Sequence, residues 1–446
     1  MEHDPEDDWW NGVVVVCREL LSHRSINVVG VGVSGIGPCV VPCDANDRPL
    51  RPAILYGIDS RASAEVDELT HLLGADVIIE RCGSALSSQA LGPKLLWLSR
   101  NEPDVWSKTC RWHMASTFVV ARLTGCWVLD HHSASQCDPL YDLDRSDWNS
   151  DWSDAVAPGL PMPPLAWAGE IVGTVGAAGC ESTGIPIGTP VIAGTIDAWA
   201  EAASVGVRAP GDLMLMYGST MFLISVSNER SPVSHLWNTR GVDPGSLTVA
   251  AGTATAGSVV DWVRRLTTLS FDTLCDEASL VDAGSEGLLF LPYFAGERTP
   301  IMDPKARGVI IGLTLAHSRA HLYRAALEGI AFGLRQIFDS LPHDSQTRGV
   351  AVGGGTRDRL WPQIVSDVCG ITQLLPTETI GASYGDTLLV AEALGLTPAR
   401  TSWTRAAATL EPVESLRLRY DKLYSLYGLL YPQTRDLQHA LSRQCV

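Results

Sequence analysis

The 446-residue sequence is poor in basic residues and lacks motifs that mark two large enzyme classes. Lysine and arginine together number 33, against 50 aspartates and glutamates, so the formal net charge is −17. Such an acidic surface does not favour nucleic acid or an anionic membrane as the main partner. The sequence contains no GK[ST] and no HExxH, which argues against a P-loop enzyme and a zincin-type metalloprotease.

Cysteine is present, but not in a pattern that indicates metal or disulfide chemistry. The eleven cysteines are scattered, their number is odd, and no CxxC occurs. This usage is typical of reduced thiols, so we expect a cytoplasmic protein without a zinc site. The longest stretch free of charge, residues 25–43, contains four glycines and two prolines, which predicts a strand, a turn and a strand rather than a membrane span.

Apolar residues make up 46% of the chain, which is enough for the cores of two α/β domains. Their spacing predicts a buried strand over 26–35, two strands around a polar turn at 44–48, and a hairpin over 212–227. A turn at 207–212 predicts the boundary between two halves. Apolar residues at helical spacing predict helices over 9–23, 62–74, 94–100, 117–123, 320–340 and 416–430.

Two glycine-containing turns are candidate phosphate-binding loops. Gly218-Ser219-Thr220 joins two predicted strands, where backbone N–H groups and hydroxyls can face an anion, although an ordinary hairpin turn has the same pattern. Gly353-Gly354-Gly355-Thr356 joins a strand to a helix expected from Asp358, and the N-terminus of a helix attracts phosphate. Taken alone, this second turn is as consistent with tight strand-to-helix packing as with a nucleotide site.

Charged residues stand out where their surroundings are nearly free of charge. Asp197 follows a predicted strand over 191–193, a position that suits a general base and equally a helix N-cap. Glu297 and Arg298 follow an apolar strand, and we expect them to form an ion pair that orders a loop. His131 and His132 are expected in an exposed loop.

Taken together and in chain order, these segments resemble the FGGY family of carbohydrate kinases, and within it most of all the xylulokinases. The similarity begins at DPEDDWW (residues 4–10) and continues through RPLRPAILYGIDSRA (48–62) and ARLTG (121–125). It includes GTIDAWAEAASVGV (194–207), LPYFAGERTP (291–300) and VGGGTRD (352–358). Because the segments follow one another over nearly the whole chain, the resemblance is specific.

The resemblance implies a two-domain α/β fold of the actin and hexokinase (ribonuclease H-like) type with a cleft between the domains. Residues 1–206 would form the N-terminal, sugar-side domain and residues 207–446 the C-terminal, ATP-side domain. The implied reaction is ATP-dependent phosphorylation of a sugar hydroxyl, with a ketopentose such as xylulose as acceptor and Mg²⁺ on the phosphates. The implied partners are therefore sugar and ATP alone, and we expect a homodimer.

The resemblance also assigns roles to the residues singled out above. Asp197 would be the general base. Gly218, Ser219 and Thr220 would hold the ATP phosphates, and Gly353, Gly354, Gly355 and Thr356 would lie at the adenosine. At the sugar, the family's Met-His pair corresponds to Gly37 and Pro38, and a family tryptophan corresponds to Tyr56, with one residue inserted before Asp59.

The sequence departs from the family at its start. Family members open with a hairpin that carries a DxGT motif, which this sequence lacks, so we expect an N-terminally truncated first domain that misses roughly 30–40 residues, a few strands with their turns. The truncation keeps open a second interpretation, a non-catalytic or impaired homologue that binds sugar or nucleotide. A dehydrogenase would need a GxGxxG in a βαβ unit followed by an acidic residue, which is not found.

Overall fold

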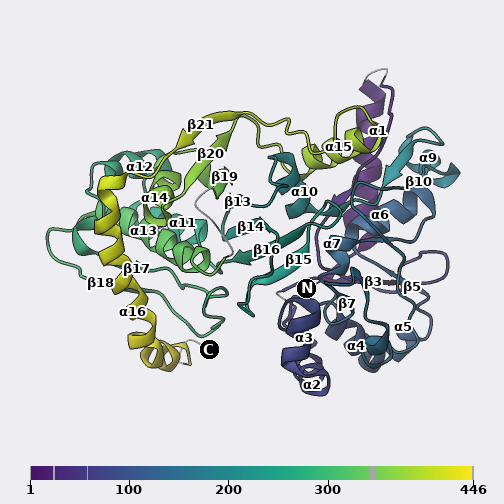
Figure 1. The fold of residues 1–446 in the computed structure, drawn as a ribbon, viewed down its shortest axis with the longest axis horizontal. Helices are drawn as coiled ribbons and strands as arrows, with labels where there is room; N and C mark the ends of the chain where they lie inside the picture. Colours follow the sequence, from purple (N-terminus) through teal and green to yellow (C-terminus); the bar gives the residue numbers. More distant parts are fainter. Residues whose placement is uncertain (1, 24–25, 58, 342–346, 444–446) are drawn as a thin grey trace. The chain divides into compact units, whose positions relative to one another are not determined.

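The computed structural model describes residues 2–23, 26–57, 59–341 and 347–443. The chain divides into two compact units, each assembled from three separate segments (Figure 1). Unit 1 comprises Met1–Arg208, Trp237–Thr248 and Ile380–Trp403. Unit 2 comprises Ala209–Leu236, Val249–Thr379 and Thr404–Val446.

Helices dominate unit 1, and its short strands pair mostly in twos. The helices are the π-helix η1 (Pro5–Trp10), α1 (Asn11–His23), α2 (Ser63–Leu73), α3 (Ala75–Cys82), α4 (Gly92–Asn101), α5 (Pro103–Trp106), α6 (Ala115–Thr124), α7 (His131–Ala134), α8 (Ser150–Val156), α9 (Ala177–Thr183), α10 (Asp197–Ser204) and α15 (Ala382–Ala393). The strands are β1 (Glu2–His3), β2 (Ser34–Gly35), β3 (Val41–Cys43), β4 (Ala53–Ile54), β5 (Arg111–His113), β6 (Leu129–Asp130), β7 (Tyr141–Asp142), β8 (Asp147–Trp148), β9 (Leu165–Ala166), β10 (Ile171–Thr174), β11 (Pro190–Ile192), β12 (Thr195–Ile196) and β15 (Trp237–Arg240).

A buried guanidinium joins the three segments of unit 1. Arg208 ends the first segment, and its Nε donates to Oδ2 of Asp243 at 2.9 Å, in the second segment. Its Nη1 donates to Oε1 of Glu392 at 2.7 Å, in the third segment. All three side chains are about nine-tenths buried. The network therefore holds together parts of the chain that lie far apart in the sequence.

The buried strand predicted over 26–35 is wrong in its extent. Only Ser34–Gly35 forms a strand, β2, and within the described residues it pairs with β12 alone, while Val31 makes an isolated bridge to Val191. Ile26 and Val29 are exposed. An apolar run becomes a fully buried strand only where neighbours cover both edges and both faces, and here one edge has no partner in the part of the chain described.

Unit 2 is built on the larger part of a seven-stranded sheet with the order β15-β16-β14-β13-β19-β20-β21. The strand β13 (Asp212–Tyr217) pairs antiparallel with β14 (Met221–Ser227), as the hairpin prediction required, and parallel with β19 (Arg348–Val352). The other strands of this unit are β16 (Leu247–Gly252), β20 (Thr372–Pro376), β21 (Ala406–Leu410), and a separate pair, β17 (Leu289–Leu291) and β18 (Val309–Ile311).

The helices of unit 2 gather beside this sheet (Figure 1). They are α11 (Gly257–Thr267), α12 (Phe271–Ser279), α13 (Arg319–Phe338), α14 (Leu360–Cys369) and α16 (Arg417–Ser442), with short 3₁₀ turns at Ser285–Gly287, Gly354–Thr356 and Glu414–Leu416. Apolar side chains from the sheet, α11, α13 and α14 form one core. Helix α16 continues well past residue 430, where the sequence pattern predicted its end.

Two absences hold for the described part of the chain. No helix there is both long enough and apolar enough to cross a membrane. The ten cysteines whose surroundings are described are all free thiols.

Candidate active site

Asp197 lies where two parallel strands of unit 1 end. Strand β12 pairs in parallel with β2, in the register Thr195–Ser34 and Ile196–Gly35. Because parallel strands end at the same edge, the segment after β2 and the segment after β12 emerge side by side. Helix α10 starts at Asp197, so its carboxylate stands at this edge.

Gly37 and Pro38 follow β2 and lie at the same edge. A Cβ atom at position 37 would lie 2.6 Å from both Cδ1 and Cγ1 of Ile196, so only glycine allows this approach to the residue before Asp197. Pro38 is buried. Neither side chain can hydrogen-bond a sugar hydroxyl, although the backbone here runs beside the candidate base.

The Asp197 carboxyl is set up to exchange a proton. Its side chain is open to solvent, but surrounding protein atoms displace part of its hydration, and this raises its pKa above the ordinary value for aspartate. Within the described residues the carboxylate accepts one hydrogen bond, from the backbone N–H of Ala198 at 2.7 Å, and this bond partly opposes the rise. A carboxylate with a raised pKa and few donors is a better base than an ordinary surface aspartate.

Two further carboxyl groups feel the charge of Asp197, and sequence reasoning missed both. Glu201 lies one turn later on α10, and burial together with the Asp197 charge raises its pKa. Burial, with Asp197 adding to it, raises the pKa of Asp386 to about 6. The spacing of four residues could have revealed Glu201, whereas Asp386 comes from the third segment of unit 1 and has no local signal.

Asp386 reaches this edge through a contact with β2. Its Oδ2 accepts a hydrogen bond from Oγ of Ser34 at 2.6 Å. Its Oδ1 is buried and has no hydrogen-bond partner within the described residues. The charge of Asp197 therefore opposes the charged forms of Glu201 and of Asp386, which favours proton uptake by these two carboxyls.

Tyr56 and Asp59, the other residues expected at the sugar, flank Ile58, which is outside the described residues. Tyr56 is half-buried. Both oxygens of Asp59 accept hydrogen bonds from the Arg61 guanidinium, at 2.8 to 3.1 Å. Burial opposes the charge, but this pairing holds the pKa of Asp59 well below its ordinary value. The carboxylate is thus already engaged by an arginine.

The prediction of an exposed loop at His131 and His132 is wrong. Both belong to α7, and His132 is buried with its ring stacked on Trp199 at a centroid distance of 3.8 Å. Burial lowers the pKa of His132 to about 3, so it is a neutral packing residue. Asp130 caps α7 and accepts a hydrogen bond from Oγ1 of Thr195 at 2.8 Å. These contacts fix the strand and helix on either side of Asp197.

In unit 2, the tip of the β13–β14 hairpin is held by the start of α11. The carbonyl of Gly218 accepts from the N–H of Gly257 at 3.0 Å, and the carbonyl of Ser219 accepts from Ala256 and Ser258. The Ser219 side chain is exposed. Because the carbonyls of Gly218 and Ser219 are both hydrogen-bonded to the start of α11, the tip is a rigid turn, and the Ser219 hydroxyl lies on its exposed side.

The two glycine turns line one cavity of about 510 Å³ in unit 2. That volume lies in the range of small-molecule and cofactor sites. Gly218 and Ser219 line it together with Gly354 and Gly355, whereas Thr220, Gly353 and Thr356 do not. The remaining wall comes from α11, α12, α13 and α14, with Phe271, Tyr323 and Trp361, and from Arg357 and Asp358 just before α14.

Close packing shapes the second glycine turn. A Cβ at Gly353 would lie 2.8 Å from the carbonyl oxygen of Tyr217, and φ there is +92°, so position 353 requires glycine. Gly355 lies against Trp361, whose ring meets Tyr217 edge-to-face at 5.1 Å. The helix expected from Asp358 begins at Leu360, whose N–H donates to the Asp358 carboxylate at 2.7 Å.

The GERTP segment, residues 296–300, ties a loop to the strand β16. Glu297 is 4% exposed, and its Oε1 accepts from the backbone N–H of Ala254 at 2.6 Å and of Arg298 at 2.8 Å. Arg298 donates to the carbonyl of Thr253 at 2.6 Å. Burial raises the pKa of Glu297 to about 7. Both side chains thus bind backbone, which gives the loop its shape.

Known proteins match this sequence over nearly the whole chain. The model of the N-terminal domain of the FGGY family of carbohydrate kinases matches residues 1–206, and that of its C-terminal domain matches residues 213–394. The xylulose kinase of Bacillus subtilis is 28% identical over 99% of this chain and 90% of the relative, and that of Escherichia coli is 30% identical over 83% and 76%.

A solved structure shows the same fold. The crystal structure of xylulose kinase from Rhodospirillum rubrum superposes with a TM-score of 0.89 at 29% identity, covering 98% of this chain and 91% of that one. The fold is therefore the two-domain, actin- and hexokinase-like α/β fold that the sequence resemblance implied. With both family domains matched in order, the chain belongs to the FGGY family of carbohydrate kinases.

Proposed function

We propose that this protein transfers the γ-phosphoryl group of ATP to a hydroxyl of a ketopentose, xylulose, with Asp197 as the general base. The observation that carries the proposal is the placement of Asp197 beside Gly37 at the ends of two parallel strands, with its pKa raised by partial loss of hydration. The relatives described as xylulose kinases support the choice of acceptor.

In the proposed reaction, the Asp197 carboxylate accepts the proton of the sugar hydroxyl as that oxygen attacks the γ-phosphorus. The bond between the γ-phosphorus and the bridging oxygen breaks, and ADP leaves with the electron pair. The 510 Å³ cavity would hold the nucleotide, with the adenosine against the turn at 353–356 and the phosphates toward Gly218, Ser219 and Thr220.

Magnesium would enter this site with the nucleotide. Mg²⁺ is commonly held by one or two carboxylates together with substrate phosphates rather than by an all-protein cage. In the part of the chain described, no group of three or more histidine, cysteine or carboxylate side chains could hold a metal. Within the described residues Asp197 accepts one hydrogen bond, so an oxygen is left for the proton of the sugar hydroxyl, and Mg²⁺ would be held mainly by the ATP phosphates.

The test is ADP release by the 446-residue chain with ATP and a panel of pentuloses, hexuloses and polyols. We expect turnover with xylulose that Asp197→Ala abolishes. Asp151→Ala is a matched control, because it removes a carboxylate of unit 1 whose ion pair with Arg81 lies at the surface. No turnover with any sugar, from a folded protein that binds both ATP and sugar, would overturn the proposal and leave the non-catalytic homologue.

A further inference from the structure

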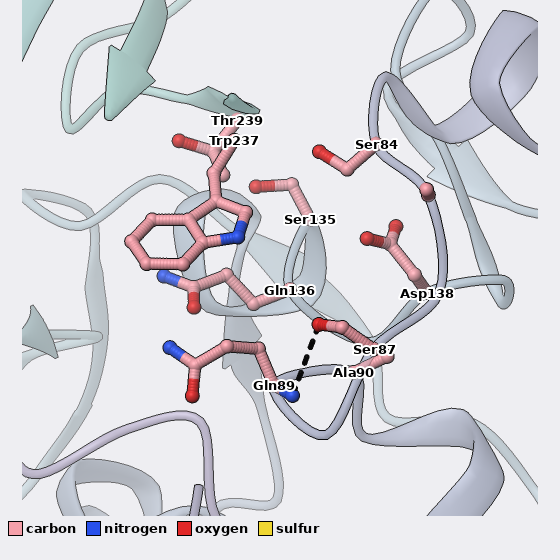
Figure 2. Close-up of a pocket in the computed structure, with 10 residues that line it drawn as sticks. Ser84, Ser87, Gln89, Ala90, Ser135, Gln136, Asp138, Trp237 and Thr239 are labelled. Atoms are coloured by element: carbon pink, nitrogen blue, oxygen red, sulfur yellow. Dashed lines mark hydrogen bonds between the residues drawn. The ribbon is translucent and has the colours of Figure 1, made fainter. Parts of the chain in front are cut away.

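Unit 1 contains a second, small cavity of about 20 Å³ with a polar lining (Figure 2). The polar groups are the amides of Gln89 and Gln136, the carboxyl of Asp138, and serine and threonine hydroxyls. The indole of Trp237 supplies an aromatic wall, and Figure 2 shows it on the same side as the two glutamine amides. A cavity needs roughly 10–15 Å³ to hold one water-sized group, so this one has room for a single hydroxyl-bearing carbon.

Two buried acceptors of this cavity have no donor within the described residues. They are Oδ1 of Asp138 and Oε1 of Gln89. Asp138 is 8% exposed, so water from bulk does not solvate it freely. A buried polar atom left without a partner costs about 1–3 kcal/mol. The pair therefore points to a bound group that donates hydrogen bonds.

The charges around the cavity indicate which kind of group this is. No lysine, arginine or histidine lines it, and its one ionisable side chain is an acid. Burial raises the pKa of Asp138 well above its ordinary value, which favours the neutral carboxyl that can both donate and accept. A phosphate or carboxylate would have no cation to pair with here. A neutral hydroxymethyl group fits both the donors and the acceptors.

The cavity adjoins the segments that carry the candidate active site. On one side, Oγ of Ser88 donates to the carbonyl of Gly57 at 2.7 Å, and Oε1 of Gln89 would lie 2.4 Å from a Cβ at Gly57. Gly57 stands between Tyr56 and Asp59 on the expected sugar-binding segment.

On the other side, the amide nitrogen of Gln136 lies 2.9 Å from Nε2 of His132. The His132 ring stacks on Trp199, two residues after Asp197. Ser135, another lining residue, is bonded through its hydroxyl to the N–H of Arg240 on β15. The cavity thus lies between the sugar-binding segment and the elements that hold α10.

We propose that this cavity, the hydroxymethyl subsite, receives the uncharged end of the acceptor sugar that is remote from the phosphorylated hydroxyl. Gln89, Gln136 and Asp138 hydrogen-bond that hydroxyl, and Trp237 packs against its carbon. The inference rests on the proposed function and narrows it to neutral sugars. It excludes aldonates that would place their carboxylate here.

The test measures sugar binding without nucleotide, by calorimetry on the full chain. The probes are D-xylulose, its 1-deoxy and 5-deoxy analogues, each of which lacks one terminal hydroxyl, and D-gluconate. We expect one deoxy analogue to bind at least about tenfold more weakly than xylulose, because it leaves the buried acceptors unpaired. We expect gluconate to bind more weakly than xylulose as well.

The variants identify the cavity as the cause. In wild type, one deoxy analogue should bind at least about tenfold more weakly than xylulose. In Gln136→Leu and in Asp138→Asn, this difference in affinity should fall to about threefold or less. Gln363→Leu is the control, because it removes a half-buried amide of α14 that is bonded to Asp367 and lies outside the cavity. This variant should show the same affinity difference as the wild type. Circular dichroism shows whether each variant is folded. If Gln136→Leu does not fold, the conservative variant Asp138→Asn still tests the cavity.

The outcomes separate the two proposals. If the wild type binds and phosphorylates xylulose but no variant of the cavity changes this difference in affinity, the hydroxymethyl subsite is overturned and the proposed function stands. If the wild type binds none of the neutral sugars, both are overturned. Tight binding of gluconate that Asp138→Asn does not alter would also contradict the subsite.

Discussion

Replacing Gly355 by alanine tests the geometry of the nucleotide cavity with a single methyl group. A Cβ at this position would lie 2.6 Å from Cζ3 and 2.8 Å from Cε3 of Trp361, and 2.9 Å from Cβ of Tyr217. Trp361 is 6% exposed and packed edge-to-face on Tyr217, so it cannot move aside freely. Overpacking of this kind costs about 1–3 kcal/mol.

Gly354 provides the matched control. A Cβ there meets nothing within 4 Å. Alanine at a compatible glycine position leaves stability unchanged or raises it by about 0.4–1 kcal/mol. Unfolding in urea should therefore show Gly355→Ala to be less stable than Gly354→Ala by roughly 2 kcal/mol.

Nucleotide binding supplies the second readout of this prediction. Because Trp361 lines the cavity, a shift of its ring should also weaken ADP binding to Gly355→Ala. If about 1 kcal/mol of the packing cost falls on binding, the affinity drops about fivefold, which calorimetry resolves. Equal stability of the two alanine variants would refute the packing described here, and unchanged ADP affinity would refute the assignment of this cavity to the nucleotide.

Three further predictions concern charged groups. Arg208→Ala should destabilise unit 1 by about 3–5 kcal/mol in urea unfolding, because it leaves the carboxylates of Asp243 and Glu392 buried without their cation. The folded pKa of Glu297 is about 7, so its protonation stabilises the protein below about pH 4.5 and this contribution is lost as the pH rises through 7. Glu297→Gln should flatten that decline, by up to about 3 kcal/mol between pH 5 and pH 8. Finally, kcat/KM for the sugar should fall on the acid side with a midpoint above pH 3.8, since Asp197 must be deprotonated to act and its pKa is raised.

Each of these has a result that would contradict it. A loss below about 0.5 kcal/mol in Arg208→Ala is what a surface pair would give, and would mean that the network does not hold unit 1 together. An unchanged pH profile of unfolding in Glu297→Gln would show that another group titrates. An acid-side midpoint of kcat/KM at or below pH 3.8 would contradict a raised pKa of Asp197.

Local sequence patterns predicted the elements that carry a clear apolar run of their own. The helices at 62–74 and 117–123 and the hairpin over 212–227 are present where the sequence places those runs. The run over 26–35 has the same apolar character, but its conformation depends on pairing with residues more than 150 positions away, at Val191 and Thr195. A pattern in one segment does not report whether distant partners are available.

The same distinction applies to the candidate site. Asp197 and the two glycine turns stand out because their neighbours in the sequence are small and uncharged. Asp386 could not be found that way, since only the folding of three segments into unit 1 brings it to Ser34. His132 was misplaced for a related reason: its partner Trp199 lies on another element, and stacking rather than polarity decides its burial. Motifs therefore identify the candidate base and the candidate phosphate-binding turns. The groups that surround the base, such as Asp386, come from distant parts of the chain and are visible only in the structure.

The role of Asp197 as the general base of a sugar kinase is the central claim to test. The most direct measurement compares the turnover of xylulose and ATP by the wild type and by Asp197→Asn, with the sugar phosphate followed by phosphorus NMR. We expect sugar phosphate from the wild type and a rate at least about a hundredfold lower from the variant, since general-base catalysis typically contributes 10²–10⁴-fold. Equal rates in the two proteins, both folded and both binding ATP, would contradict the central claim.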